Sequence, residues 1–199
     1  SNASSVSGPL PKDVKKSLIF ILMSVAFWFI AYNAVTTAFS RYATHAWGLE
    51  GGGYADCLLI ATVAAIISYI PIGIIASKIG RKKMILIGIV LLGACFLAAG
   101  LYNTYHWTMV IFFGIIGFAW ASIGVNSYPM VVEMSSAGDV GKYTGLYYTF
   151  SMSAQVLTPI LSGFLLEKVS YYTLFPYAVV FSVLAFITMS QVKHGDEKA

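Results

Sequence analysis

The sequence is poor in charge. Of its 199 residues only 10% are Asp, Glu, Lys or Arg, whereas 58% are hydrophobic and the mean hydropathy is +0.79. A soluble domain usually carries about 25% charged residues, so this chain folded in water would expose large apolar patches. A lipid bilayer solvates such a surface. The composition therefore excludes a soluble globular protein and indicates an integral membrane protein.

Cysteine and acidic residues are scarce as well. The two cysteines, Cys57 and Cys95, both lie inside apolar runs, which excludes a disulfide framework. Twelve Lys and Arg stand against eight Asp and Glu, and the placement of the cations along the chain explains the net charge of +4. We therefore expect no nucleic-acid partner. The apolar runs contain no Asp-rich cluster, and we expect neither a metal nor a cofactor.

Six apolar runs are long enough to cross a bilayer, which takes about 20 residues each. They are residues 17–40, 54–77, 83–102, 107–131, 143–167 and 172–191. The sequence thus predicts an all-α membrane protein whose six transmembrane helices form one unit, residues 17–192. Residues 1–3, Ser-Asn-Ala, are typical of the remnant of a cleaved expression tag. Polar residues 4–16 indicate a cytoplasmic linker or tail, and residues 193–199 a second cytoplasmic tail.

Lys and Arg are distributed unequally about these runs. Both termini and the loops after the second and fourth runs share one side, which holds ten of the twelve cations. The other side keeps only Arg41 and Lys168. Because cytoplasmic loops carry an excess of Lys and Arg, we expect a multi-pass protein of the inner (plasma) membrane with both termini in the cytoplasm.

An intramembrane enzyme finds no support in the sequence. A serine protease of this kind needs a Ser and a His at membrane depth, and Ser122 lies in "AWASIG". However, His45, His106 and His194 all fall in loops or the tail, and no Asp pair lies at depth. We therefore expect no enzymatic activity and no catalytic residue.

Residues 73–83, "GIIASKIGRKK", pack four cations between the second and third runs. The segment resembles the loop signature of the major facilitator superfamily. That resemblance implies one six-helix half of a facilitator fold, built from two inverted three-helix repeats. Ser77 stands where the signature has Asp, and linker-like residues precede the first run. Both features favour the C-terminal half.

The same resemblance implies roles for four residues of the loop and its surroundings. Gly73 would allow a close approach of helices, and Gly80 would permit the tight turn. Arg81 would pair with Glu133, near the end of the fourth run, as a gate on the cytoplasmic side. The alternative for Glu133 is a carboxylate that water alone solvates.

A second resemblance covers the fourth and fifth runs. The segment from "GFAWASIG" to "SGFLLE" is similar to the second half of the glycoside–pentoside–hexuronide and sucrose-type sugar symporters. The matching residues are Pro129, Gly141, Tyr143, Gly145, Gln155 and Pro159. The chain has Tyr128-Pro129-Met130 where those symporters favour Pro-Tyr-Ala. This resemblance implies a sugar or glycoside as the transported solute.

Polar and aromatic residues recur at helical spacing in three runs, which favours one face of each helix. In the fifth run Tyr148, Ser151, Gln155, Thr158 and Ser162 are spaced three or four apart. For the serines and Thr158, packing between helices is the main alternative, whereas an amide needs partners that an apolar interface lacks. The predicted substrate-binding residues are Trp28, Tyr32, Asn33, Asn126, Tyr148, Ser151 and Gln155.

The sequence predicts secondary active transport of a small hydroxylated solute by alternating access. A proton or sodium ion would move with the solute, and the bilayer and either a missing N-terminal six-helix half or a homodimer mate would be partners. Two alternatives remain open. One is a facilitator that carries drugs or peptides, and the other is a membrane scaffold subunit that transports nothing.

Overall fold

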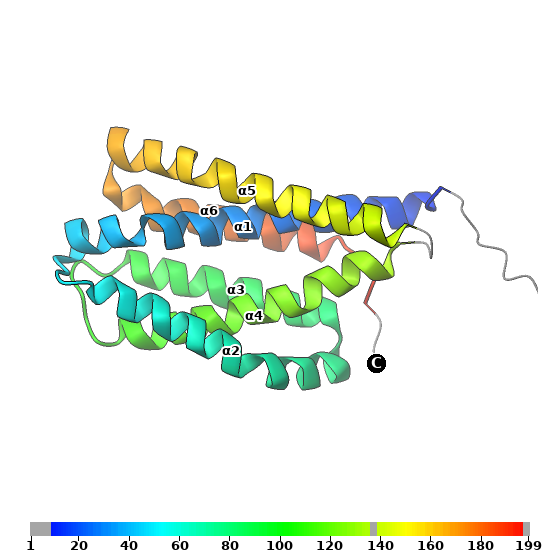
Figure 1. Cartoon of the computed structure of the whole chain (residues 1–199), viewed down its shortest axis with the longest axis horizontal. Coiled ribbons are helices and arrows are strands. Elements are labelled where there is room, and N and C mark those ends of the chain that lie inside the picture. The colour runs from blue at the N-terminus through cyan, green and yellow to red at the C-terminus, as the bar shows by residue number, and fades with distance from the viewer. Residues whose placement is uncertain (1–8, 136–138, 197–199) are drawn as a thin grey trace, which may run out of the picture.

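Six helices that are long and apolar enough to cross a membrane make up the described chain (Figure 1). The computed structural model describes residues 9–135 and 139–196, in which there is no strand. The helices are α1 (Lys12–Trp47), α2 (Gly53–Ile79), α3 (Arg81–Gly100), α4 (Met109–Glu133), α5 (Val140–Lys168) and, after the short 3-10 helix η1 (Tyr171–Thr173), α6 (Leu174–Ser190). The predicted fold class, an all-α membrane protein with six transmembrane helices, is confirmed.

The first helix differs most from the predicted boundaries. α1 begins at Lys12 and is 36 residues long, so it takes in residues 12–16, which the sequence placed in the linker. The predicted tag remnant, residues 4–8 of the linker and residues 197–199 of the tail lie outside the described residues.

The first three helices and the last three pack in the same way, with α1, α2 and α3 corresponding to α4, α5 and α6. α4 packs on α2 and α3, and α1 packs correspondingly on α5 and α6, while α3 packs on α6. α1 and α4 run in opposite directions along the bundle (Figure 1). The structure thus has the two inverted three-helix repeats expected of a facilitator half, with α1 and α4 at the centre of the two repeats.

Small residues let α4 approach its two neighbours closely. A Cβ added at Gly117 of α4 would overlap the backbone carbonyl of Ala61 in α2. A Cβ at Gly88 of α3 would lie 2.8 Å from the backbone oxygen of Ala119 in α4. Helices in lipid associate largely through such close packing, so these glycines fix the position of α4 in the bundle.

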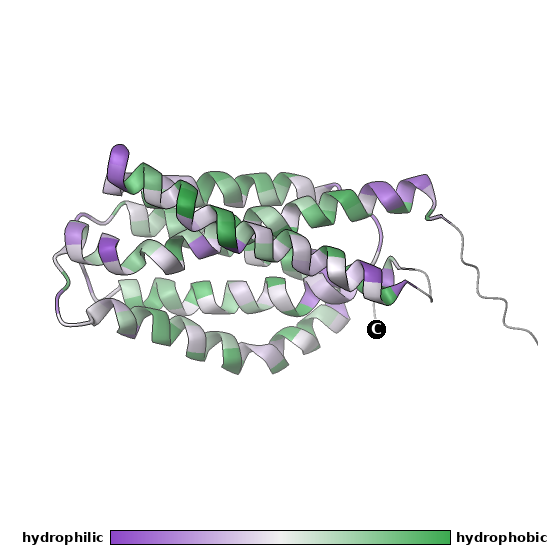
Figure 2. Cartoon of the chain, turned by 45° about the horizontal axis from the view of Figure 1, so that its top comes forward, coloured by the Kyte–Doolittle hydropathy of each residue, from purple (hydrophilic) through white to green (hydrophobic). Residues whose placement is uncertain are grey.

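Charged residues gather at the two ends of the bundle, and the helices between them are mostly apolar (Figure 2). We call "the basic end" the end where α1, α3 and α5 begin and where α2, α4 and α6 terminate (Figure 1). Its described cations are Lys12, Lys15, Lys16, Lys78, Arg81, Lys82, Lys83, Lys142 and Lys193. The opposite end has Arg41 and Lys168. All but one of the predicted cytoplasmic cations thus share one end, and Lys198 lies outside the described residues.

α2 and α5 are the least buried helices of the bundle. In the most apolar window of α2 only 17% of the residues are buried, and in that of α5 only 28%. Large apolar side chains such as Ile67 and Ile70 of α2 and Val156 and Ile160 of α5 are exposed. These two helices therefore have faces that the rest of the described chain leaves uncovered.

Candidate functional site

Three aromatic side chains join the central helices of the two repeats. The rings of Tyr32 in α1 and Trp120 in α4 are stacked, with centroids 3.8 Å apart and planes at 6°. The ring of Phe29 is nearly perpendicular to the same indole, at 80°, with centroids 5.1 Å apart. All three side chains are partly exposed. We call Phe29, Tyr32 and Trp120 the aromatic stack. It lies within the apolar stretch of both helices.

Two predicted amides lie on these same helices. Asn33 is partly exposed, and its Nδ2 donates to the Phe29 carbonyl oxygen at 2.9 Å. Asn126 is 3% exposed, and its Nδ2 donates to the Ser122 carbonyl oxygen at 2.7 Å. An amide offers two N–H donors and one carbonyl acceptor. Each therefore has donor and acceptor capacity beyond the single side-chain bond that it makes in the described chain.

We call the spaced residues of α5, Tyr148, Ser151, Gln155, Thr158 and Ser162, the polar stripe. Tyr148 and Gln155 are its exposed members. Tyr148 is 48% exposed. Gln155 is exposed, and its amide makes no hydrogen bond with any residue in the described part of the chain. A free amide is costly in hydrocarbon. The side chain of Gln155 is therefore the polar group on this helix most in need of an external partner.

The hydroxyl groups of the stripe lie on its inner side and serve packing. Ser151 is 2% exposed and donates to its own helix, as does Ser162, which is 1% exposed. Thr158 Oγ1 donates to the Ile30 carbonyl oxygen of α1 at 2.9 Å and lies 3.1 Å from the Tyr177 hydroxyl of α6. We call the exposed surface formed by α1, α4 and α5 the open face. Ser151 does not lie on it, and helix packing explains all three hydroxyls.

Three tyrosines form a second aromatic group between α4 and α5. The rings of Tyr128 and Tyr147 are 5.5 Å apart, and those of Tyr147 and Tyr148 are 5.6 Å apart. The Tyr147 hydroxyl lies 3.0 Å from Ser127 Oγ, and the Tyr128 hydroxyl lies 3.0 Å from Thr144 Oγ1. Their phenol groups thus tie α4 to α5 on the side toward the basic end, and Tyr148 reaches the surface.

Trp28 is placed differently from its predicted role. Its side chain is fully buried in the main apolar core, so it does not lie on the open face with the aromatic stack. Its Nε1 is the one buried side-chain N or O atom without a hydrogen-bond partner in the described residues. Helical spacing places Trp28 and Tyr32 near one another on α1, but it does not show that the packing of the bundle buries Trp28.

The basic turn consists of a single residue between two helices. Gly80 separates α2 from α3 at φ 98°, a conformation that favours glycine. Arg81 Nη1 lies 3.7 Å from Glu133 Oε1, which joins the start of α3 to the end of α4. Around Gly73, by contrast, no described atom would come within 4 Å of an added Cβ. The close approach expected at Gly73 is therefore absent among the described residues.

The opposite end has an ion pair that the sequence did not point to. Arg41 Nη1 of α1 bonds Glu167 Oε1 of α5 at 3.1 Å. His45, one turn beyond Arg41, stacks on Tyr171 with ring centroids 4.0 Å apart. The pair spans 126 positions, so no local spacing indicates it. It joins α1 to α5 at the end opposite the basic end.

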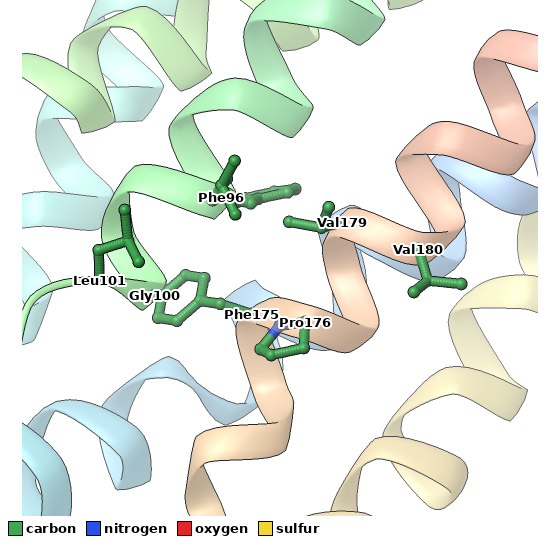
Figure 3. Close-up of a pocket in the computed structure, with 8 residues that line it drawn as sticks. Phe96, Gly100, Leu101, Phe175, Pro176, Val179 and Val180 are labelled. Carbon is green, nitrogen blue, oxygen red and sulfur yellow. The ribbon is translucent and has the colours of Figure 1, made fainter.

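An apolar pocket on the surface lies between two other helices of the bundle. Figure 3 shows this pocket between α3 and α6, of about 290 Å³. Its lining is Phe96, Leu97, Gly100, Leu101, Phe175, Pro176, Val179 and Val180. These residues carry no polar side-chain atom that could orient a polar solute, so the pocket is suited to lipid chains.

The family of the chain can be stated from its sequence. The model of the Major Facilitator Superfamily matches residues 16–197, which is almost the whole chain. The chain belongs to the major facilitator superfamily. The six helices are therefore a six-helix unit of the facilitator fold.

A curated relative of this facilitator unit supports the same assignment. An uncharacterised MFS-type transporter of the archaeon Methanocaldococcus jannaschii is 28% identical over 116 residues. The match covers 58% of this chain and 29% of that protein. The chain thus spans well under two thirds of the length of its relative.

Proposed function

We propose that this facilitator unit takes part in secondary active transport of a small, neutral, hydroxylated solute of the sugar or glycoside class. The observations that support this are the aromatic stack between α1 and α4 and two amides with free hydrogen-bonding capacity, Asn33 next to Tyr32 on α1 and Gln155 on α5. Aromatic faces pack on the C–H faces of a sugar ring, and amides bond its hydroxyl groups. The resemblance of α4 and α5 to sugar symporters points the same way.

The charge distribution favours a neutral solute. Residues 17–40, the apolar stretch of α1, contain no Asp, Glu, Lys or Arg. The corresponding stretches of α4 and α5, residues 109–132 and 143–166, contain none either. A charged solute at that depth would lack an opposite charge in this unit.

A panel of related solutes tests this proposal. In the complete carrier reconstituted in liposomes, we expect uptake of neutral mono- or disaccharides. The matching uronic acids and amino sugars should be taken up at least about tenfold more slowly, because their charge is not paired in the path. Uptake of the charged forms at equal rates, or of apolar drugs or peptides in place of sugars, would contradict the proposal.

The transport cycle in this proposal is alternating access by a twelve-helix carrier. The uncovered faces of α2 and α5 and the polar groups on the open face need a second six-helix unit. An N-terminal half or a second copy of the chain would supply it. A proton or sodium ion would accompany the solute, and the basic end would lie in the cytoplasm of the plasma membrane, in accord with the excess of cations there.

Arg81 and Glu133 form the proposed gate on the basic end. Because both side chains are partly exposed (25% and 38%), their coupling should be about 0.5–1 kcal/mol. We expect R81Q/E133Q to change turnover no more than either single substitution does. R41Q and E133Q, which lie at opposite ends, should act additively and serve as the control pair. Additive effects of R81Q and E133Q on turnover would contradict the proposed gate pair.

A further inference from the structure

The segment that follows α6 makes polar contacts with both α1 and α3. Residues Lys193–Asp196 lie at the basic end against the start of α1, the start of α3 and the end of α4. Neither the solute path nor the Arg81–Glu133 pair explains these contacts. We call Lys193–Asp196 the tail segment.

The tail segment is bound to α1 through Ser17. The backbone N–H of Lys193 donates to Ser17 Oγ at 3.0 Å, and His194 Nδ1 lies 2.8 Å from the same oxygen. The other ring nitrogen, Nε2, lies 3.3 Å from Asp13 Oδ2. Ser17 is only 3% exposed, so its hydroxyl is used almost entirely by the tail segment.

Asp196 binds the first turn of α3. Its Oδ1 accepts a hydrogen bond from the backbone N–H of Lys82 at 3.2 Å. The N–H groups of a first helical turn have no partner within the helix, and the preceding Gly80 has no side chain to cap them. That turn also contains three cations and no acidic residue. A carboxylate there is favourable for both reasons, and only the tail segment supplies one to Lys82 within the described chain.

Other groups near this turn have hydrogen-bond partners besides Asp196. Ser77, just before the turn, donates its hydroxyl to the Ile74 carbonyl oxygen of its own helix. Lys82 Nζ donates to the Ser190 carbonyl oxygen at the end of α6 at 3.0 Å. Arg81 Nη1 donates to the Gly195 carbonyl oxygen at 3.5 Å. Arg81 therefore contacts both the tail segment and Glu133.

Gly195 allows the tail segment to lie close to α4. Its φ is 82°, a conformation that favours glycine. An added Cβ would lie 2.6 Å from the Met130 carbonyl oxygen and 3.1 Å from Met134 Cε. Met134 itself is 4% exposed. The tail segment thus covers the last turn of α4, which ends at Glu133.

We propose that the tail segment is a latch that holds α1, α3 and α4 together at the basic end, and that Asp196 and His194 are positioning residues for the Arg81–Glu133 pair. Asp196 fixes the first turn of α3, which carries Arg81, and His194 fixes the segment to α1. Release of the latch frees Arg81 from Gly195 and uncovers the end of α4. The effect of the latch on transport rests on the proposed function, whereas the docking of the tail segment does not.

A cysteine under the latch measures docking without any solute. Met134→Cys places a thiol beneath Gly195. The native Cys57 and Cys95 are only 0% and 4% exposed. The chain without M134C therefore gives the background rate of alkylation. We expect D196A, H194A and G195A, each combined with M134C, to raise the alkylation rate of the introduced thiol by N-ethylmaleimide about tenfold. Glu50→Ala, which removes an exposed carboxylate at the opposite end, should leave the rate unchanged. Equal rates in all variants would overturn the latch.

Amide exchange separates loss of the latch from general unfolding. In D196A, hydrogen exchange of the Lys82 amide should accelerate about tenfold while amides in the middle of α3 keep their protection. D196N retains a side-chain carbonyl acceptor and should restore part of the protection of Lys82. Exchange that rises equally along α3, or no change at Lys82, would contradict the role given to Asp196.

Transport by the complete carrier tests the positioning role itself. D196A should change turnover by a factor on the order of three or more while the KM for the solute stays the same, because the latch lies far from the aromatic stack. If D196A makes the thiol of M134C reactive and turnover does not change, the tail segment docks but positions nothing, which overturns the positioning role. Since alkylation and exchange need no solute, they stand even if the solute proposed above is wrong.

Discussion

Replacement of Gly117 by alanine should be among the most damaging single changes to the fold. The added Cβ would overlap the carbonyl oxygen of Ala61 and lie 2.8 Å from its carbonyl carbon. Because the obstacle is backbone, α2 would have to move away from α4, which costs about 1–3 kcal/mol or more. For a chain of this length, thermal unfolding in detergent should begin about 5–10 °C lower.

The same helix offers a matched control. Gly124 lies two turns further along α4, and no described atom would come within 4 Å of an added Cβ there. Gly124→Ala should therefore be neutral or raise the melting temperature slightly, since alanine favours a helix more than glycine does. Equal losses of stability in G117A and G124A would contradict the role given to the contact between Gly117 and α2.

Replacement of Gln155 by leucine should abolish most transport and leave folding intact. Gln155 is exposed on α5 among apolar neighbours such as Val156, and its amide has no partner among the described residues. Leucine is better solvated by lipid, so the fold loses nothing. If the amide bonds the solute with one or two hydrogen bonds, uptake by the complete carrier should fall about 10–100-fold.

The second glutamine of the chain is the control for this substitution. Gln191 follows α6 at the basic end, where it is exposed. Q191L should transport at the normal rate, and both variants should reach the membrane in equal amounts. Normal uptake by Q155L would move the solute path elsewhere or favour a scaffold that transports nothing.

Much of the fold could be predicted because lipid imposes simple rules on a sequence. A span needs about 20 apolar residues, and cations favour one side. The six spans and the shared end of the cations follow directly. The starts and ends of helices are less constrained, because a helix can extend into water, as α1 does from Lys12.

The candidate site was harder to predict because periodicity gives the face of a helix but not what covers it. The stripe on α5 exists, yet Ser151 lies on the part that packs inward, whereas Gln155 lies at the open edge. Trp28 lies one turn from Tyr32 and is nevertheless fully buried. Only the neighbouring helices decide which residues of a stripe stay open.

Contacts between distant helices give no signal within a single helix. Helical periodicity places Trp120 on a different face of α4 from Asn126. Trp120 is therefore not among the binding residues predicted from the sequence. The structure stacks Trp120 on Tyr32 of α1 at 3.8 Å. The contacts of Asp196 with the start of α3 join residues 114 positions apart. Such pairs emerge only once the helices are packed.

We propose that the open face formed by α1, α4 and α5 lines a water-filled solute path. The most direct test is thiol labelling of the complete carrier in membranes with a membrane-impermeant reagent. Gln155→Cys should react, and the transported solute should slow that reaction. Leu97→Cys, 54% exposed on the α3–α6 side in this chain, should stay unreactive because lipid covers it. Labelling of the L97C variant together with an unreactive Q155C variant would contradict the account.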